Sequence, residues 1–197
     1  PPRAPFFRKE LREFLILTKQ NGMDPLAIKG SYAGAMGFPQ FMPSSWRNLA
    51  VDFDGDNRID LINNPVDAIG SIANYFKGNG WRSNELVAVR ARLTNQSYDN
   101  ATSTELKTVS TLAQLATQGI APLQALELPA STPVSGIRLQ GMNGGEFWIG
   151  FNNFYVITRY NRSILYAMAA LQLSQALEAA KQERNQAAAA TGVNLLP

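Results

Sequence analysis

Asp52-Phe-Asp-Gly-Asp-Asn-Arg-Ile-Asp-Leu-Ile-Asn-Asn-Pro-Val-Asp67 is the most acidic stretch of this chain and holds five of its 15 Asp and Glu residues. Asp52, Asp54 and Asp56 stand two residues apart, as do positions 1, 3 and 5 of an EF-hand calcium loop. Carboxylates crowded into one turn repel each other unless a hard cation neutralises them, and oxygen-only ligands suit calcium. The stretch therefore predicts a calcium loop; the alternative is an acidic turn exposed to solvent.

The loop departs from the EF-hand pattern at two positions. Asn57 stands where a tight-turn glycine is usual, and asparagine tolerates the left-handed conformation better than most residues. Asn63 stands where a bidentate glutamate is usual, so we expect Asp67 to close the site. Arg58 would offer its backbone carbonyl at the seventh position, and Asp60 occupies the ninth.

Helices are predicted on both sides of this loop. Pro43 is typical of the first residue of a short helix, and Asn64 can cap a second helix that begins at Pro65. Gly78 and Gly80 would end the second helix. Its expected buried stripe consists of Ile69, Ile72, Ala73 and Phe76. Two helices around an acidic loop form a helix–loop–helix calcium unit.

A further helix is predicted over residues 7–20, with Asn21-Gly22 as its C-terminal stop. Glu10 and Glu13 fall on one side of this helix, where we expect water to solvate them. The apolar face on the other side carries Phe7, Leu11, Phe14, Leu15 and Thr18.

The next segment combines small residues with amide and aromatic side chains. Gly30-Ser-Tyr-Ala-Gly-Ala-Met-Gly37 allows its backbone to approach a ligand or a neighbouring helix closely. Gln40, Phe41, Met42 and Trp46 then place an amide beside apolar faces, an arrangement with which proteins hold sugars or peptides. An ordinary loop with its aromatic rings in the core explains the same residues equally well.

The composition shifts to Thr, Ser, Gly and Val from about residue 86 to residue 155. A strand is predicted over residues 86–93, and a short helix over residues 111–118 with Ser110 as its cap. Residues 137–140 and 146–151 are typical of a β-hairpin. We interpret this region as a small antiparallel insert between helical parts.

A last helix is predicted over residues 162–183, with Asn161 as its cap. Tyr160, Asn161 and Tyr166 are candidates for a polar-aromatic site at its start, although capping and core packing explain them as well. The Ala- and Gln-rich end of the chain is expected to be a fraying helix and tail.

Composition excludes several classes of protein. The chain has 197 residues, 45% of them hydrophobic and 17% charged, which indicates a globular protein of one large or two small domains. A net charge of +3 without a basic cluster argues against nucleic acid as a partner. No apolar run reaches the roughly 18 residues that cross a bilayer. The absence of histidine excludes histidine-based triads and most zinc chemistry.

The residues alone therefore predict a calcium-stabilised mixed domain with a cleft lined by aromatic and amide groups. Neither a cysteine nor an evident pair of catalytic carboxylates is present in the sequence. A cysteine-free chain with a calcium loop fits an oxidising, calcium-rich compartment. A start at Pro1, without methionine or signal peptide, is typical of a fragment or a processed product.

Several of these motifs resemble the lytic murein transglycosylase B family, of the glycoside hydrolase family 103 type. The signature-like run is Gly30-Ser-Tyr-Ala-Gly-Ala-Met-Gly-Phe-Pro-Gln-Phe-Met-Pro-Ser-Ser-Trp46. Similar motifs follow at Ala50–Asp56, Asp67–Phe76 and Gly80-Trp81, and flanking ones at Phe6–Leu11 and Arg159–Met168. The resemblance extends in the family's order to about Leu173 and is weakest in the β-rich insert.

The resemblance implies an α+β, mainly α fold: a lysozyme-like helical core with an EF-hand-like calcium loop and a small antiparallel β insert. Residues 1–81, with the calcium loop at 52–67, would form the first part of the core. Residues 82–152 would form the insert, residues 153–183 the closing helix and residues 184–197 a tail. The implied localisation is the periplasm of a Gram-negative bacterium, with outer-membrane anchoring of the full-length protein as one option.

The implied activity is cleavage of the β-1,4 bond between N-acetylmuramic acid and N-acetylglucosamine in peptidoglycan, with formation of a 1,6-anhydromuramoyl end. By motif, Ser31 and Gln40 match the polar groups nearest the family's catalytic glutamate. Arg3 matches a basic residue of the substrate cleft. The glycan-contacting residues would be Phe41, Tyr75, Tyr160, Asn161 and Tyr166. The structural Ca²⁺ ligands would be Asp52, Asp54, Asp56, Arg58 through its carbonyl, and Asp67.

The family's catalytic glutamate has no match in this sequence. In the family it lies upstream of a segment that corresponds to the beginning of this chain, and Glu10 matches a different position. We therefore expect the glutamate N-terminal to Pro1 and expect this chain alone to be inactive. The alternative is a non-catalytic, calcium-stabilised peptidoglycan-binding module. The implied partners are glycan strands, and other cell-wall enzymes are further candidates.

Overall fold

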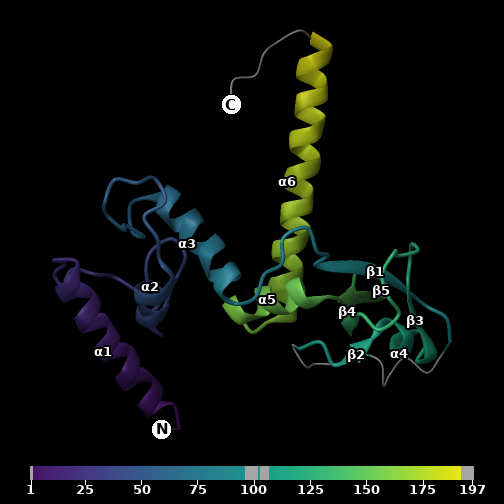
Figure 1. Cartoon of the computed structure of the whole chain (residues 1–197), viewed down its shortest axis with the longest axis horizontal. Coiled ribbons are helices and arrows are strands. Elements are labelled where there is room, and N and C mark those ends of the chain that lie inside the picture. The colour runs from purple at the N-terminus through teal and green to yellow at the C-terminus, as the bar shows by residue number, and fades with distance from the viewer. Residues whose placement is uncertain (1, 96–101, 103–106, 192–197) are drawn as a thin grey trace. The chain divides into compact units, whose positions relative to one another are not determined.

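The computed structural model describes residues 2–95, 102 and 107–191. The chain divides into two compact units, Pro1–Trp81 and Arg82–Pro197, and Figure 1 shows the helices and strands of each. The closing helical part, predicted from the sequence to belong to the core, falls in the second of these units. The domain boundaries given above stay a prediction.

The first unit contains three helices, each with a proline in its first turn: α1 (Ala4–Gln20), α2 (Pro43–Leu49) and α3 (Pro65–Gly78). Proline is tolerated there because a first-turn N–H has no acceptor within the helix. The Asn64 cap is confirmed, since its side-chain oxygen accepts the N–H groups of Val66 and Asp67. All three predicted helices are present, and α1 begins three residues earlier than expected, at Ala4.

The expected faces of α1 were wrong in part: Thr18 is buried and Phe14 half-buried, but the glutamates are not solvated. Glu10 is buried, with 5% of its surface exposed, whereas Leu11 and Leu15 are 58% and 52% exposed. Glu13 is half-buried and pairs with Arg47 of α2. The acidic side of α1 therefore faces the rest of the unit, because α2 supplies hydrogen-bond donors to it.

The expected buried stripe of α3 was wrong for Ile69 and Ala73, which are exposed, while Ile72 and Phe76 are half-buried. Ile69 is 66% exposed, while the polar Asp67 and Ser71 are fully buried. Ser71 accepts the Val51 N–H at 3.0 Å, and the ring of Phe53 lies so close to Gly70 that a Cβ there would come within 2.3 Å of it. The inner face of α3 is thus polar and small because it holds the acidic loop.

The second unit is built on a five-stranded antiparallel sheet in the order β2-β4-β5-β1-β3. Its strands are β1 (Ala88–Leu93), β2 (Ser110–Thr111), β3 (Ile120–Pro122), β4 (Pro133–Gly141) and β5 (Gly144–Gly150). The predicted hairpin is confirmed as β4 and β5, which pair from Ser135 with Gly150 to Gly141 with Gly144. The central β5 lies between β4 and β1.

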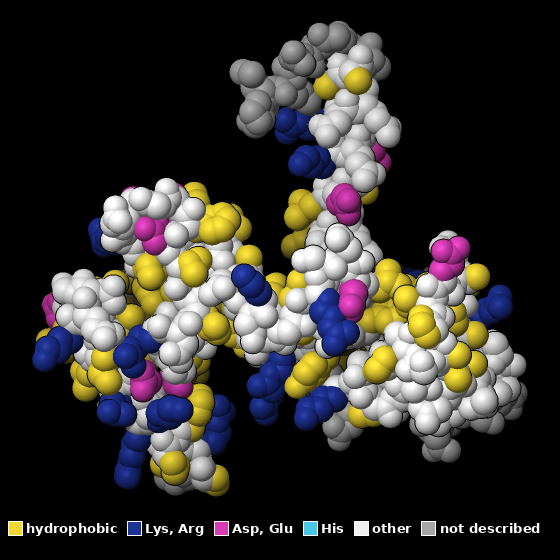
Figure 2. All heavy atoms as spheres, in the orientation of Figure 1, with side chains coloured by type: hydrophobic (Ala, Val, Ile, Leu, Met, Phe, Trp, Pro, Cys, Tyr) yellow, Lys and Arg dark blue, Asp and Glu magenta, His cyan; other side chains and the backbone are white. Residues whose placement is uncertain are grey.

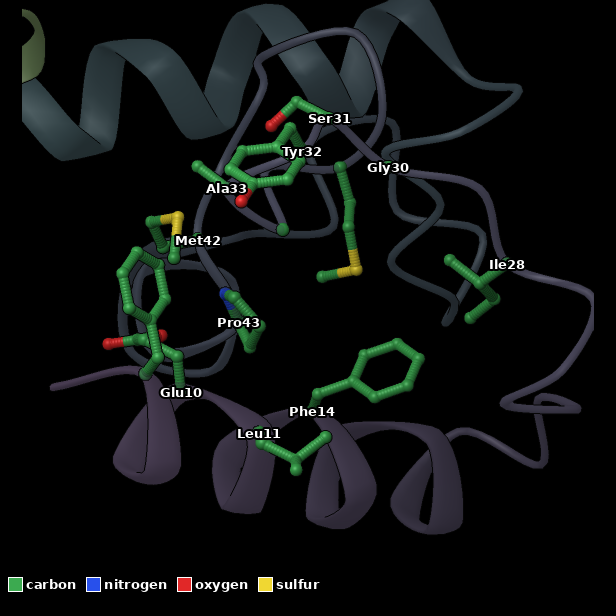
Figure 3. Close-up of a pocket in the computed structure, with 13 residues that line it drawn as sticks. Glu10, Leu11, Phe14, Ile28, Gly30, Ser31, Tyr32, Ala33, Met42 and Pro43 are labelled. Carbon is green, nitrogen blue, oxygen red and sulfur yellow. The ribbon is translucent and has the colours of Figure 1, made fainter. Parts of the chain in front are cut away.

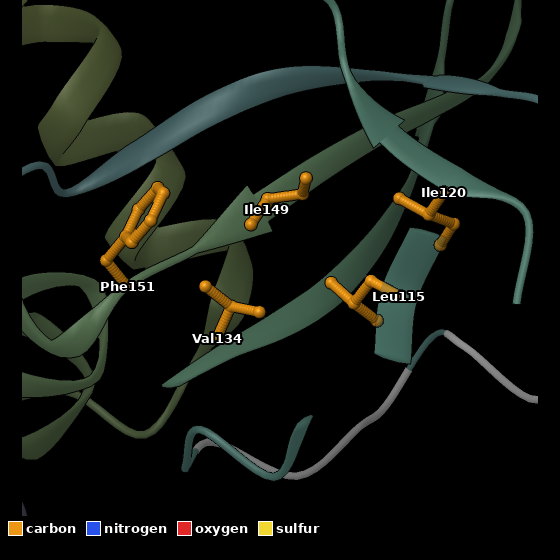
Figure 4. Close-up of a cluster of buried hydrophobic side chains, with 5 residues drawn as sticks. All are labelled: Leu115, Ile120, Val134, Ile149 and Phe151. Atoms are coloured by element: carbon orange, nitrogen blue, oxygen red, sulfur yellow. The ribbon is translucent and has the colours of Figure 1, made fainter. Parts of the chain in front are cut away.

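The core of the second unit lies where α4 (Leu112–Thr117) meets the sheet. Figure 4 shows the cluster, whose members are Leu115, Ile120, Val134, Ile149 and Phe151, none more than 5% exposed. Thr111 caps α4, not Ser110 as predicted, because Thr111 and Gln114 form a reciprocal capping box.

Trp148 is buried on β5, with its ring under the guanidinium of Arg90 at 4.8 Å. Within the described residues, its indole N–H has no hydrogen-bond partner. The other two tryptophans lie in the first unit: Trp46 is buried on α2, and Trp81 stacks on Phe76 at 5.6 Å.

Two helices follow the sheet: α5 (Asn152–Tyr160) and α6 (Ile164–Thr191). The sequence predicted only the second, and it begins two residues later than expected. Ser163, not Asn161, accepts a first-turn N–H of α6, that of Tyr166, because Asn161 is the C-cap of α5. Among the described residues, none of the helices combines the length and apolar character needed to cross a bilayer.

Candidate functional site

The segment from Gly30 to Phe41 forms a closed loop in the first unit. Met36 and Phe41 exchange two backbone hydrogen bonds, of 2.9 and 3.1 Å, and Met36 also bridges to Gly30. At the far end of the loop, the Ser31 hydroxyl accepts the Ala35 N–H at 3.1 Å. The segment therefore holds its shape through its own backbone, without belonging to a sheet.

Ser31 and Gln40 place exposed polar groups on this segment. Gln40 adopts a left-handed φ of 51°, and its side-chain amide donates to the Gly37 carbonyl at 2.9 Å. A hydroxyl and a primary amide can each both donate and accept hydrogen bonds. Both residues can therefore bind hydroxyl or acetamido groups of a ligand.

Phe41, which directly follows Gln40, forms an aromatic pair with Tyr75. Their ring centroids are 5.6 Å apart and their planes are inclined by 42°. Phe41 is only 2% exposed, whereas Tyr75 on α3 is half-buried. A ligand would therefore meet the ring of Tyr75, which Phe41 supports from beneath.

A cavity of about 280 Å³ lies between α1 and the Gly30–Pro43 segment. In Figure 3, Phe14 points from α1 toward the segment that carries Ser31 and Tyr32, and Leu11 of α1 also lines the cavity. Ser31 lines this cavity, and Gln40, Phe41 and Tyr75 lie outside it. The wall is mainly apolar, with the carboxylate of Glu10 as its charged member.

Arg3 lies at the N-terminus of α1, beside two phenylalanine rings. Its guanidinium carbon is 5.5 Å from the ring centre of Phe6 and 5.1 Å from that of Phe7. These cation–π contacts hold the charge of an exposed residue near the start of the helix. Exposed Lys and Arg side chains continue along α1 at Arg8, Lys9, Arg12 and Lys19, and Figure 2 shows blue side chains gathered in this region.

The remaining predicted glycan contacts belong to the second unit. Tyr160 ends α5 and Tyr166 lies in the first turn of α6, and their rings stack with centroids 6.4 Å apart and planes inclined by 7°. Asn161 is exposed between the two helices. Within this unit the three predicted residues therefore do come together.

The acidic loop brings three carboxylates to one point. One oxygen from each of Asp52, Asp54 and Asp56 lies within 4.8 Å of the others. Gly55 and Asn57 adopt left-handed φ values of 78° and 68°, which turn the backbone around this point. The tolerance of Asn57 for this conformation, predicted from the sequence, is confirmed.

Backbone N–H groups hold the carboxylate of Asp52 in place. One of its oxygens accepts from Gly55 at 2.7 Å and the other from Asn57 at 2.8 Å. A carboxylate offers about four lone-pair positions, so these bonds leave room for a cation. Oxygen donors alone, converging in one turn, fit calcium.

Asp67 lies in the interior of the loop, outside the group of three carboxylates. It is fully buried, and its two oxygens accept the N–H groups of Phe53 and Asp60, both at 2.8 Å. These bonds tie Phe53 and Asp60 of the loop to the first turn of α3. The role of Asp67 as a metal ligand, like that of the Arg58 carbonyl, stays a prediction.

Hydrogen bonds lower the pKa of two carboxyl groups in the loop. The Asn64 side-chain amide, which donates to Asp54 at 2.8 Å, is the main cause of the lowered pKa of Asp54. At Asp60, partial burial raises the pKa, but donors from Asn63 and Ile62 outweigh it and leave the pKa below its usual value. Both groups are therefore held in the charged form that binds a cation.

The loop is joined directly to the Gly30–Phe41 segment. The Phe38 N–H donates to the Leu61 carbonyl at 2.8 Å, and Leu61 is fully buried. Gly37 has a left-handed φ of 67°, and a Cβ there would lie 2.3 Å from the same carbonyl oxygen. The predicted metal loop and the predicted glycan segment are therefore in backbone contact.

Residues 1–175 match a family model described as the transglycosylase SLT domain. This chain belongs to that family. The chain is 47% identical over 181 residues to membrane-bound lytic murein transglycosylase B of Escherichia coli (strain K12). That match covers 92% of this chain and 48% of the relative, so the chain spans about half the relative's length.

Solved structures of lytic transglycosylases resemble this SLT domain closely. Soluble lytic transglycosylase SltB1 from Pseudomonas aeruginosa has a TM-score of 0.86 and 48% identity, covering 92% of this chain and 60% of that one. E. coli Slt35 in complex with calcium has a TM-score of 0.82 and 47% identity, covering 91% and 55%. SltB3 from P. aeruginosa in complex with NAG-anhNAM-pentapeptide has a TM-score of 0.71 and 31% identity, covering 85% and 44%.

These matches confirm the family and the coarse fold. The chain has a lysozyme-like lytic transglycosylase fold that combines helices with an antiparallel sheet. Sequence reasoning missed one buried contact of this SLT domain, that of Glu10 with Ser44, because the two residues are 34 positions apart. The available signal was that Glu10 lies at helical spacing from Phe7 and Phe14, but we expected its carboxylate to be solvated.

Proposed function

We propose that this chain is part of a peptidoglycan lytic transglycosylase, which cleaves the β-1,4 bond between N-acetylmuramic acid and N-acetylglucosamine and forms 1,6-anhydro-N-acetylmuramic acid. The Gly30–Phe41 segment carries the proposal. It presents the exposed polar residues Ser31 and Gln40, and its last residue, Phe41, pairs with the ring of Tyr75, in a chain that belongs to the SLT family. The P. aeruginosa relative SltB3 is known in complex with NAG-anhNAM-pentapeptide, which supports a glycan ligand.

The proposed reaction sets clear demands on the site. The bond from C1 of the muramoyl ring to the O4 leaving group breaks and O4 takes up a proton, while O6 of the same ring bonds to C1 and loses its proton. No water is consumed, so the protein has to hold O6 near C1 and keep water away. Ser31 and Gln40 would orient the acetamido and hydroxyl groups, and Tyr75 would cover the apolar face of a sugar ring.

Both proton transfers need a carboxyl group with a raised pKa. We propose that neither Glu10 nor Glu13 is this group, since Glu10 is hydrogen-bonded to Ser44 and Glu13 is paired with Arg47. No glutamate of this sequence matches the family's catalytic motif, so we propose that the chain alone binds glycan without cleaving it. These engaged glutamates also favour the alternative, a non-catalytic peptidoglycan-binding module.

In the second unit, we propose that Tyr160, Asn161 and Tyr166 make further glycan contacts. The parallel rings of the two tyrosines support this role, because they offer a flat apolar surface of the kind on which sugars stack. Arg3 and the other cations of α1 suit the acidic groups of peptidoglycan.

A structural calcium ion is the proposed cofactor. Asp52, Asp54, Asp56, the Arg58 carbonyl and Asp67 would hold it, and the close approach of three carboxylates and the E. coli Slt35 complex with calcium support the ion. Calcium would fix the loop and would take no part in the chemistry.

We propose the periplasm of a Gram-negative bacterium as the site of action. The E. coli relative is a membrane-bound lytic murein transglycosylase, which supports a cell-envelope enzyme. Peptidoglycan glycan strands are the proposed partners. Outer-membrane anchoring of the full-length protein and contacts with other cell-wall enzymes are further parts of the proposal.

Incubation with purified peptidoglycan tests the proposed function. Binding is measured by co-sedimentation, and soluble products are identified by mass spectrometry. The chain alone should bind and release no anhydromuropeptides, while a version that also carries the expected glutamate and the E. coli relative should release them. Tyr75→Ala should weaken binding, and Leu177→Ala, on the exposed part of α6, should not.

Three results would contradict parts of this proposal. Anhydromuropeptides from the chain alone would mean that one of its own acids performs the chemistry. Binding by the longer version without any cleavage would favour the binding module. A chain that does not bind peptidoglycan at all would overturn the proposed function.

A further inference from the structure

Glu10 is a buried carboxylate that the proposed reaction does not use. It lies on α1 and is 5% exposed. Both of its oxygens accept hydrogen bonds from one residue of α2: Oε1 from the Ser44 hydroxyl at 2.8 Å and Oε2 from the Ser44 N–H at 3.0 Å. Burying a carboxylate is costly unless it is hydrogen-bonded, so this pair of charge-assisted bonds accounts for its place in the unit.

The start of α2 depends on this carboxylate. The N-cap residue, Met42, makes no side-chain capping bond, and Pro43 has no N–H to satisfy. The Ser44 N–H is therefore a first-turn amide without an acceptor in its own helix. Glu10 provides the acceptor that a capping Ser or Asp would usually provide.

The start of α2 in turn fixes the end of the Gly30–Phe41 segment. Met42 directly follows Phe41, and its carbonyl accepts the Trp46 N–H at 2.9 Å as the first bond of α2. Phe41 is bonded twice to Met36 across the segment. A shift of the first turn of α2 would therefore displace Phe41 and strain its two backbone hydrogen bonds with Met36.

We infer that Glu10 is a positioning residue for glycan binding: through Ser44 it anchors the first turn of α2 and so holds Gln40, Phe41 and the loop before them in the binding geometry. The inference rests on the proposed function. One rival is direct contact of Glu10 with the ligand, because its side chain also lines the cavity that Ser31 borders.

Two substitutions separate these roles. Glu10→Gln keeps an acceptor for the Ser44 N–H, and its amide can donate to the Ser44 hydroxyl, so both contacts survive without the charge. Glu10→Met keeps a similar volume and removes the acceptor. Glu13→Gln is the matched control, because it breaks a different α1–α2 contact, the ion pair with Arg47.

The test measures the Kd for a peptidoglycan-derived GlcNAc–MurNAc tetrasaccharide by calorimetry, and amide hydrogen exchange at Met36 and Phe41 without ligand. For Glu10→Met we expect a Kd about tenfold higher and exchange about tenfold faster, the size of effect that a lost charge-assisted hydrogen bond gives. Glu10→Gln should stay within about threefold of the wild type in both, and Glu13→Gln should change neither. Ser44→Ala, which removes one of the two donors, should fall between Glu10→Gln and Glu10→Met and stands in for the latter if that variant does not fold.

Unchanged exchange at Met36 and Phe41 in Glu10→Met, or in Ser44→Ala where it replaces Glu10→Met, would overturn the inference. So would a Glu10→Gln variant that binds as poorly as Glu10→Met while its exchange matches the wild type, since charge or direct contact would then be what matters. A wild-type chain that does not bind the tetrasaccharide would count against the proposed function instead, and the exchange data would still decide whether Glu10 holds the segment.

Discussion

Gly37 lies where the Gly30–Phe41 segment meets the acidic loop. Replacement by alanine would place a Cβ 2.3 Å from the Leu61 carbonyl oxygen, at a φ of 67°. We expect Gly37→Ala to lower the free energy of unfolding of the first unit by about 2–4 kcal/mol, from backbone strain and overpacking together. Urea unfolding followed by circular dichroism measures this change.

Gly34→Ala is the matched control for this prediction. Gly34 also has a left-handed φ, of 85°, but nothing lies within 4 Å of its Cβ position. Only the conformational cost should remain, about 1–2 kcal/mol. If both variants lose the same free energy of unfolding, the clash of the new Cβ with Leu61 does not contribute to the loss in Gly37→Ala.

Asn64 links the cap of α3 to the charge of Asp54. Asn64→Ala should cost about 1 kcal/mol as a lost N-cap, and should raise the pKa of Asp54 toward its usual value. A carboxyl whose pKa is lower in the folded state stabilises the protein above its unfolded pKa, about 4, and this contribution is lost as the pH falls through the folded pKa. The variant should therefore lose less stability than the wild type on acidification below pH about 4, in calcium-free buffer.

Carbon-13 NMR titration of the aspartate carboxyls checks this assignment residue by residue. Asn63→Ala serves as the control, because Asn63 donates to Asp60 and not to Asp54. Asn63→Ala should raise the pKa of Asp60 and leave the pKa of Asp54 unchanged. If the pKa of Asp54 is the same in Asn64→Ala and in the wild type, the hydrogen bond from Asn64 is not the cause of the lowered pKa.

At the scale of elements, the acidic loop is the part of the first unit that calcium should stabilise. A ligand that binds only the native state adds about 2.7 kcal/mol at roughly a hundredfold excess over its Kd. We expect the melting temperature of the wild type to rise with calcium and to fall back with chelator. Asp54→Ala should abolish this response.

Glu178→Gln is the control for charge alone, since this exposed carboxylate lies on α6, far along the chain from the loop. It should keep the full calcium response. If calcium does not change the melting temperature of the wild type, or if it changes that of Asp54→Ala equally, the metal assignment is wrong.

Local rules predicted the elements well and the packing between them poorly. Pro43, Pro65 and Asn64 marked helix starts because their effects act within one turn. The burial of Glu10 and Asp67 could not be read in the same way, since their partners, Ser44 and Phe53, come from other parts of the chain. A prediction from hydrophobic spacing assumes that the inward-facing side chains of a helix are apolar. Here Glu10 on α1 and Asp67 and Ser71 on α3 are buried instead.

In the candidate site, too, local patterns predicted contacts within one turn but not contacts between elements. The spacing of Asp52, Asp54 and Asp56 was enough to predict that their carboxylates converge, because one turn of backbone brings them together. The ring pair of Phe41 and Tyr75 joins two elements 34 residues apart, and only the family resemblance singled it out. Side-chain contacts between elements depend on the tertiary fold, which no local pattern contains.

At the scale of the whole molecule, α6 extends far beyond the body of its unit. Among the side chains that the structure describes, that of Leu171 is the last strongly buried one, and every residue from Gln172 to Ala187 is exposed. We expect a chain that ends at Ala180 to unfold within about 0.5 kcal/mol of the wild type in urea. A chain that ends at Ala170 loses Leu171 and should be about 2–4 kcal/mol less stable. A large loss of stability in the chain that ends at Ala180 would show that the far part of α6 packs against another part of the protein.

The tryptophans divide between the two units, with Trp46 and Trp81 in the first and Trp148 in the second. Each unit therefore contains its own intrinsic fluorophore. A Trp148→Phe variant would emit from the first unit alone, and a variant that keeps only Trp148 would emit from the second. Comparing the denaturation curves of the two emissions would show whether the halves of this chain melt as one cooperative body or in separate steps, without any external label.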